Sequence, residues 1–125
     1  MAIELELSNM PADLKLKWVL NELQADDRFL VKGIEDIKYY YAAKQNFSEI
    51  LWYVTRVLKE KYGSRLLRQM KIEVEYDCHF LEIQIPIAQS GLELSREMIS
   101  ICEDARKMYG TTADDFFLIT QYEKY

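Results

Sequence analysis

The chain has 125 residues, half of them hydrophobic and 30% charged, and a net charge of −5 at pH 7. This size and composition fit one domain with its own core, and they exclude collagen-like, low-complexity and disordered chains. No apolar run is long enough for a transmembrane helix, no signal peptide opens the sequence, and Cys78 and Cys102 lack metal-ligand spacing. We therefore expect a cytoplasmic protein with a single domain over residues 1–125.

The first two elements are predicted close to the N-terminus. Ile3, Leu5 and Leu7 alternate with glutamates, and this period of two indicates a short, half-buried strand. A helix from about Pro11 to Gln24 follows, because a proline that suits a helix start precedes apolar residues at helical spacing. The N-terminal strand has to pair with strands later in the chain, since a lone strand leaves its backbone groups unpaired.

Two further helices are predicted between residues 30 and 63. The first has one apolar face made of Leu30, Ile34, Ile37 and Tyr41. Asn46, with Glu49 three residues later, is typical of a capping box at the start of the second. The apolar stripe of that helix changes phase at Gly63, so we expect Gly63 to end the helix as a left-handed cap.

The second half of the chain changes to a period of two and then back to helical spacing. Two strands are indicated by apolar residues at alternate positions: Ile72, Val74 and Tyr76, then Leu81, Ile83, Ile85 and Ile87. They meet near Asp77–His79, so a hairpin is the simplest connection. A fourth helix, closed by Gly110 as its C-cap, has an apolar face made of Leu94, Met98, Ile101, Cys102, Ala105 and Met108. An aromatic and β-branched run from Phe116 to Tyr122 predicts the last strand.

These elements predict an α+β fold in the order β-α-α-α-β-β-α-β. We expect a mostly antiparallel four-stranded sheet with the helices on one face. In the hairpin, the alternation directs four polar residues away from the core: Glu73, Glu75, Glu82 and Gln84. The second face of the sheet is therefore expected to meet water or a partner.

The sequence lacks the residue patterns of common catalytic and cofactor sites. His79 is the single histidine, and its neighbour Cys78 points to the opposite face if both lie in a strand. The four glycines form no phosphate loop, and the adjacent carboxylates have no metal-ligand spacing. We expect no catalytic residue, no cofactor and no metal. The alternative is an enzyme or small-ligand binder centred on His79, with Asp77 or Glu82 nearby.

One compact basic segment stands out in this acidic chain. Residues 56–71 carry six basic side chains and one acidic side chain. Three interpretations remain open: the segment docks nucleic-acid phosphates, it meets an acidic protein surface or a second copy of the chain, or its charges are ordinary at the C-terminal end of a helix. The overall charge of −5 opposes the nucleic-acid interpretation, because the acidic remainder repels a phosphate backbone.

Aromatic residues are the second unusual feature. Tyr39, Tyr40 and Tyr41 are consecutive on a predicted helix, so all three cannot face the core. Together with Trp52 on the next helix, they are typical of the centre of a protein interface. The alternative is that these rings pack across the groove between the two helices, with their hydroxyls at its rim.

From these features we predict a non-enzymatic protein-binding or assembly module that forms a homodimer. Aromatic anchors and charge steering would provide surface complementarity to a protein partner or a second copy, and no membrane is involved. A nucleic-acid-binding module that uses residues 56–71 is the first alternative. The predicted partner-binding residues are Tyr39, Tyr40, Trp52, Arg56, Lys59, Arg65 and Arg68.

Overall fold

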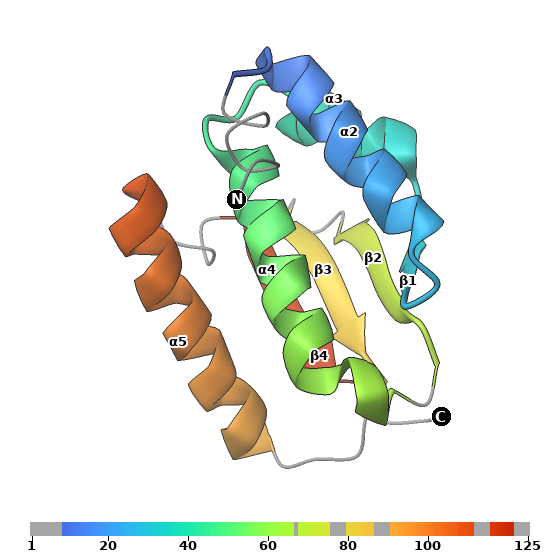
Figure 1. Ribbon diagram of the computed structural model, residues 1–125, viewed down its shortest axis with the longest axis vertical. Helices are drawn as coiled ribbons and strands as arrows, with labels where there is room; N and C mark the ends of the chain where they lie inside the picture. The colour runs from blue at the N-terminus through green and yellow to red at the C-terminus, as the bar shows by residue number, and fades with distance from the viewer. Residues whose placement is uncertain (1–8, 67, 76–79, 87–90, 112–115, 122–125) are drawn as a thin grey trace.

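The helices of this chain lie on one face of a mixed β-sheet in the computed structural model (Figure 1). The structure describes residues 9–66, 68–75, 80–86, 91–111 and 116–121. These ranges contain four α-helices, one short 3-10 helix and four strands. In chain order they are α2 (Ala12–Ala25), β1 (Phe29–Val31), α3 (Ile34–Tyr41), α4 (Phe47–Tyr62), η1 (Gly63–Arg65), β2 (Met70–Glu75), β3 (Phe80–Ile85), α5 (Gly91–Tyr109) and β4 (Phe117–Gln121).

The sheet has the strand order β1-β2-β3-β4, and two of its three pairings are parallel. Only the hairpin of β2 and β3 is antiparallel. The expected mostly antiparallel sheet is therefore wrong. The reason is that helices connect β1 to β2 and β3 to β4, and such a crossover returns the chain in the same direction. The α+β class is confirmed, with the order α-β-α-α-β-β-α-β in the described residues.

Strand β1 was not predicted, because three residues are too few to show a period. Leu30 belongs to this strand, so its assignment to the second helix is wrong, and that helix, α3, begins only at Ile34. Phe29 of β1 pairs with Met70 of β2 and lies in the core. The strand expected over residues 3–7 lies outside the described residues.

The helix ends correct two of the expected caps and confirm a third. Asn46 has a φ of 63° and makes no capping hydrogen bond; its side-chain amide donates to the Tyr109 carbonyl, so the capping box is wrong. Gly63 has a φ of −52°, within the right-handed region, and the chain continues directly into η1. The left-handed cap predicted there is therefore wrong. Gly110, with a φ of 78°, is the left-handed cap expected after α5.

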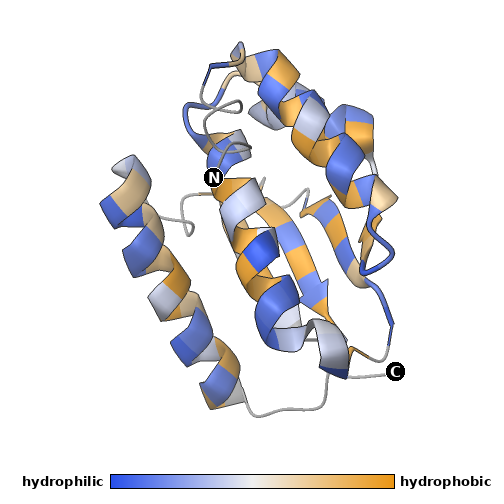
Figure 2. Ribbon diagram, in the orientation of Figure 1, coloured by the Kyte–Doolittle hydropathy of each residue, from blue (hydrophilic) through white to orange (hydrophobic). Residues whose placement is uncertain are grey.

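The core lies between the sheet and the helices. Figure 2 shows hydrophobic and hydrophilic residues alternating along β2 and β3, as the period of two predicted. Tyr41 and Phe47 stack on one another, and Phe47 also stacks on Phe117 of β4. Two residues of α5 that were expected on its buried face are not fully buried: Met108 is 51% exposed and Cys102 is half-buried. None of the described helices combines the length and the hydrophobicity needed to cross a bilayer.

Candidate functional site

The predicted partner-binding residues fall in three separate places. Tyr39 and Tyr40 lie on α3, where Tyr39 is 83% exposed and Tyr40 packs against the core. Three others lie on α4, and Arg65 and Arg68 lie in and after η1. Figure 1 shows α3 and the end of α4 at opposite ends of the molecule. The tyrosine pair and the basic segment therefore do not form one continuous surface.

On α4, helical spacing brings Trp52, Arg56 and Lys59 together around Asp26 of the turn after α2. The Lys59 ammonium lies 2.6 Å from one Asp26 carboxylate oxygen, and the Arg56 guanidinium lies 3.5 Å from the same oxygen. Arg56 also stacks over the Trp52 ring, 4.3 Å from its centroid. These contacts hold α4 against the turn that leads into β1.

Opposing effects act on the ionisation of Asp26. Burial by itself raises the pKa of its carboxyl group, but a hydrogen bond from Lys59, the backbone N–H of Arg28 and the charges of Lys59 and Arg56 together lower the pKa below its usual range. The shallow hollow beside this cluster is also lined by Glu22 and Asp27, so acidic groups outnumber basic ones. Among the described residues, the Arg56 Nε atom is buried without a hydrogen-bond partner. The cluster therefore mainly links α4 to the turn after α2. Its surplus of acidic groups disfavours the binding of an anion.

Acidic side chains of α5 also partner the basic segment. Lys61 lies 3.2 Å from Glu97, and Arg65 lies 3.9 Å from Glu93 while its guanidinium faces the Tyr62 ring. Much of the charge between residues 56 and 71 is thus neutralised within the chain. Sequence reasoning missed this because the acidic partners are about 30 residues away from the basic ones.

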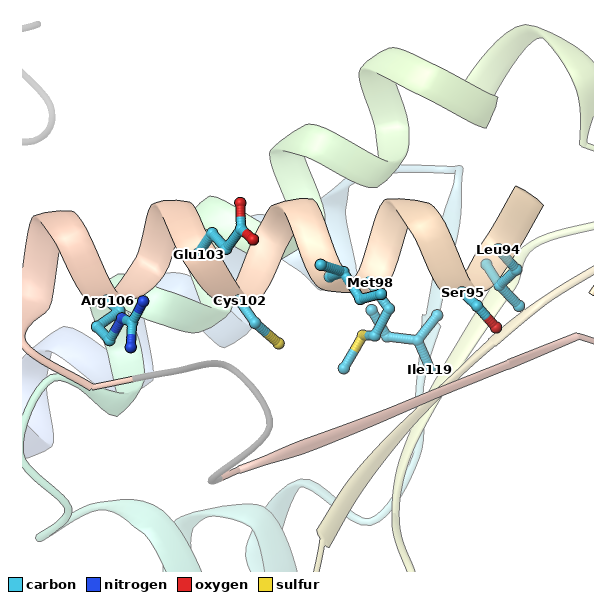
Figure 3. Close-up of a pocket in the computed structure, with 8 residues that line it drawn as sticks. Leu94, Ser95, Met98, Cys102, Glu103, Arg106 and Ile119 are labelled. Atoms are coloured by element: carbon cyan, nitrogen blue, oxygen red, sulfur yellow. The ribbon is translucent and has the colours of Figure 1, made fainter. Parts of the chain in front are cut away.

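A second feature, an apolar groove, opens between α5 and the edge strand β4. Its volume is about 550 Å³. Figure 3 shows Met98 and Cys102 pointing from α5 toward β4, where Ile119 lies. The lining residues are Leu94, Ser95, Met98, Ile99, Cys102, Glu103, Arg106 and Ile119. The groove is apolar at its base and has charged groups at its rim.

Contacts with α4 explain why α5 leaves this groove open. The Tyr53 hydroxyl donates a 3.0 Å hydrogen bond to Asp104, and burial, followed by that hydrogen bond, raises the pKa of Tyr53 to about 12. With the ion pair of Lys61 and Glu97, this bond fastens one flank of α5 to α4. The opposite flank, next to β4, packs less closely, and Ile99 on that flank is 59% exposed.

Beside the groove, β4 is the last strand of the sheet in the part of the chain that the structure describes. Strand β4 pairs with β3 along one side, and no other described strand pairs with its second side. An unpaired edge presents backbone N–H and C=O groups that accept another strand. An apolar groove beside such an edge is the geometry of strand addition.

The sequence held one signal for this site that the prediction did not use. Leu92 and Ile99 are seven residues apart on α5, outside the stripe assigned to the core. Both are exposed, at 62% and 59%. The helix therefore has apolar residues on two flanks, although only one flank is needed to cover α4.

The His79 alternative is not tested by the structure. Cys78, His79 and Asp77 lie outside the described residues. Glu82 lies on the open face of the sheet, where it accepts hydrogen bonds from Gln84 and Thr120. No group of three metal-ligating side chains occurs in the part of the chain that the structure describes.

Comparisons of the chain with protein-family models, with curated proteins and with solved structures found no match. The function is therefore argued from the fold and from the surfaces described above.

Proposed function

We propose that this chain is a non-enzymatic protein-binding module whose main contact surface is the groove between α5 and β4. The observation that carries the proposal is the combination of an apolar groove, the exposed side chains of Leu92 and Ile99, and the edge of β4 that no other described strand pairs with. Exposed apolar surface next to a hollow favours docking of another polypeptide.

The apolar side chains at this surface can contribute substantially to binding. Fully burying a Leu or Ile side chain contributes about 1.5–3 kcal/mol. Since Leu92 and Ile99 are each about 60% exposed, covering them contributes roughly 1–2 kcal/mol each.

The basic segment fits this proposal as a steering surface. Its pairing with Asp26, Glu93 and Glu97 leaves too little free positive charge to favour nucleic acid over protein. Arg65 remains about half exposed, so it stays available at the rim of a protein interface. In the predicted homodimer, this protein partner is a second copy of the chain.

The test is capture of partners by the full chain and by two matched variants. Ile99→Asp places a charge beside the groove, and Leu14→Asp makes the same kind of change at an exposed leucine of α2. We expect the wild type and Leu14→Asp to capture the same protein from the native host, and Ile99→Asp to lose it at least tenfold. Binding should weaken little between low and high salt.

Two outcomes contradict the proposal. Equal capture by both variants shows that the groove is not the contact surface. Recovery of RNA or DNA would instead favour the nucleic-acid-binding function. In that case log affinity should fall steeply with log salt, with a slope of about −0.9 for each phosphate contacted.

A further inference from the structure

The flank of α5 that faces away from α4 carries a regular row of side chains. Leu92, Ile99 and Arg106 are seven residues apart, so they lie along one line of the helix, and all three are exposed. Ser95 and Cys102 fall between them, and the spacing along the row therefore alternates between three and four residues. We call these five residues the outer row. Spacing of this kind is the pattern with which one helix packs lengthwise against another.

The position of α5 in the molecule leaves the outer row accessible. Figure 1 shows α5 at one side of the molecule, beside α4. Glu97 and Asp104 face α4, where they bind Lys61 and Tyr53. By helical spacing, these two acids lie on the side of α5 opposite Ile99, which is 59% exposed. A second protein can therefore approach the outer row without displacing α4.

Two charged side chains border the outer row. Arg96 lies three residues before Ile99 and Glu103 lies four residues after it, so both fall on the same side of the row. Both are exposed, and within the described residues neither forms an ion pair. The row is thus bordered by a positive charge before its centre and by a negative charge after it, and it complements its own reverse.

We propose that the outer row of α5 binds the outer row of a second copy of the chain, with the two helices antiparallel across a two-fold axis near Ile99. This inference rests on the proposed function, since it names the partner of that same surface. The two Ile99 side chains then meet at the axis, and Leu92 of each copy lies against the aliphatic part of Arg106 of the other.

The two bordering charges fix the direction of the second helix. At the rise of an α-helix, Arg96 lies about 4.5 Å before Ile99 and Glu103 about 6 Å after it. An antiparallel two-fold arrangement reverses this order in the second copy and keeps both charges on the same side of the interface, so each Arg96 comes opposite Glu103 of the other copy. A parallel arrangement places each charge at the height of its own equivalent, and no such pair forms. Charge complementarity therefore favours the antiparallel dimer.

The same contact also covers one wall of the groove. Ser95 and Cys102 belong both to the outer row and to the lining of the groove. A helix docked along the outer row therefore removes the α5 side of the groove from water. Because the row complements itself in its apolar and in its charged positions, a second copy fits it on both counts.

The test is self-association of the full chain, measured by sedimentation equilibrium at rising protein concentration. We expect a dimer that dissociates on dilution. Arg96→Glu and Glu103→Arg should each weaken dimerisation about tenfold or more, because each reversal places like charges opposite one another twice in a two-fold dimer. Lys17→Glu is the matched control, since it reverses an exposed charge on α2, and it should leave dimerisation unchanged.

Mixing the two α5 variants is the decisive measurement. Arg96→Glu carries acidic groups at both bordering positions and Glu103→Arg carries basic groups at both, so each variant repels itself while the two attract one another. An equimolar mixture should therefore form a heterodimer with about the affinity of the wild type. Recovery of the dimer in the mixture also shows that both variants are folded.

Three outcomes overturn the inference: a wild-type chain that stays monomeric at every concentration, a dimer that both reversals leave intact, and a mixture that stays monomeric. An equal loss of the dimer in Lys17→Glu also overturns it, because net charge and not the outer row then controls association. Partner capture with Ile99→Asp is measured separately. A monomeric chain that still captures a host protein through the groove therefore leaves the proposed function standing.

Discussion

Asp26 shows how single residues connect the sequence to the packing of α4. Its carboxylate lies in the turn after α2, yet it binds Lys59 and Arg56, two of the residues predicted to contact a partner. An ion pair within the chain neutralises part of the charge that a side chain could offer to a partner. The main role of these two basic residues is therefore to bind the turn after α2 to α4.

Replacing Asp26 by Asn is expected to lower the free energy of unfolding by about 1–2 kcal/mol at pH 7, because the negative charge that binds Lys59 and Arg56 is lost, although the amide oxygen still accepts from the backbone N–H of Arg28. The folded state lowers the pKa of Asp26, so its contribution is complete above the ordinary value of 3.8 and is lost as the pH falls through the lower, folded value. Urea unfolding at pH 7 and at pH 3 measures both effects.

Asp27 provides the matched control for this prediction. Its side chain is 95% exposed, so Asp27→Asn should change the stability by no more than about 0.5 kcal/mol. An equal loss of unfolding free energy in both variants would show that the stability depends on the turn itself and not on the ion pairs between Asp26 and α4.

At the scale of elements, the C-terminal ends of α4 and α5 show two different ways in which a helix ends. Tyr62 leads from α4 into η1 through a right-handed Gly63, whereas α5 stops at a left-handed Gly110. A Cβ built at Gly63 meets only ordinary contacts, 3.5 Å from Lys59 and 3.8 Å from Arg28. Glycine is thus required by backbone conformation at the second position only.

This difference predicts opposite effects for the same substitution. Gly63→Ala should leave stability unchanged or raise it by up to about 1 kcal/mol, since alanine restricts the unfolded chain. Gly110→Ala should lower stability by about 1 kcal/mol, because L residues rarely adopt a positive φ. Thermal unfolding of the two variants side by side measures the contrast. A loss at Gly63 as large as at Gly110 would contradict the right-handed assignment.

At the scale of the whole molecule, long-range strand pairing joins the two halves of the chain. Phe29 and Val31 of β1 pair with Met70 and Ile72 of β2, about 40 residues later. Figure 1 shows α4 in front of β3 and β4, which follow it in the sequence, and Phe47 of α4 stacks on Phe117 of β4. The N-terminal half therefore has no sheet of its own to bury its helices against.

We predict from this that a fragment of residues 1–68 does not fold by itself. Without Met70 and the strands after it, β1 loses the one described strand that it pairs with, and the buried face of α4 meets water. Circular dichroism during urea titration, together with light scattering, measures the outcome. A monomeric fragment with a cooperative transition would contradict the prediction.

Local periodicity determined much of this fold. The helical spacing before Gln24 and the hairpin of β2 and β3 were predicted because one buried face imposes a period of 3.6 or 2 on neighbouring residues. The same rule brings Trp52, Arg56 and Lys59 onto one side of α4, since they are three or four residues apart.

Tertiary structure decided the rest. The parallel pairings, the short strand β1 and the ion pair of Asp26 with Lys59 depend on residues 30 to 50 positions apart, and no local pattern encodes such contacts. The groove was also hidden, because Met98 and Cys102 have the spacing of core residues. They line a groove only because contacts with α4 hold α5 away from β4, and hydrophobic spacing alone cannot tell a covered flank from an open one.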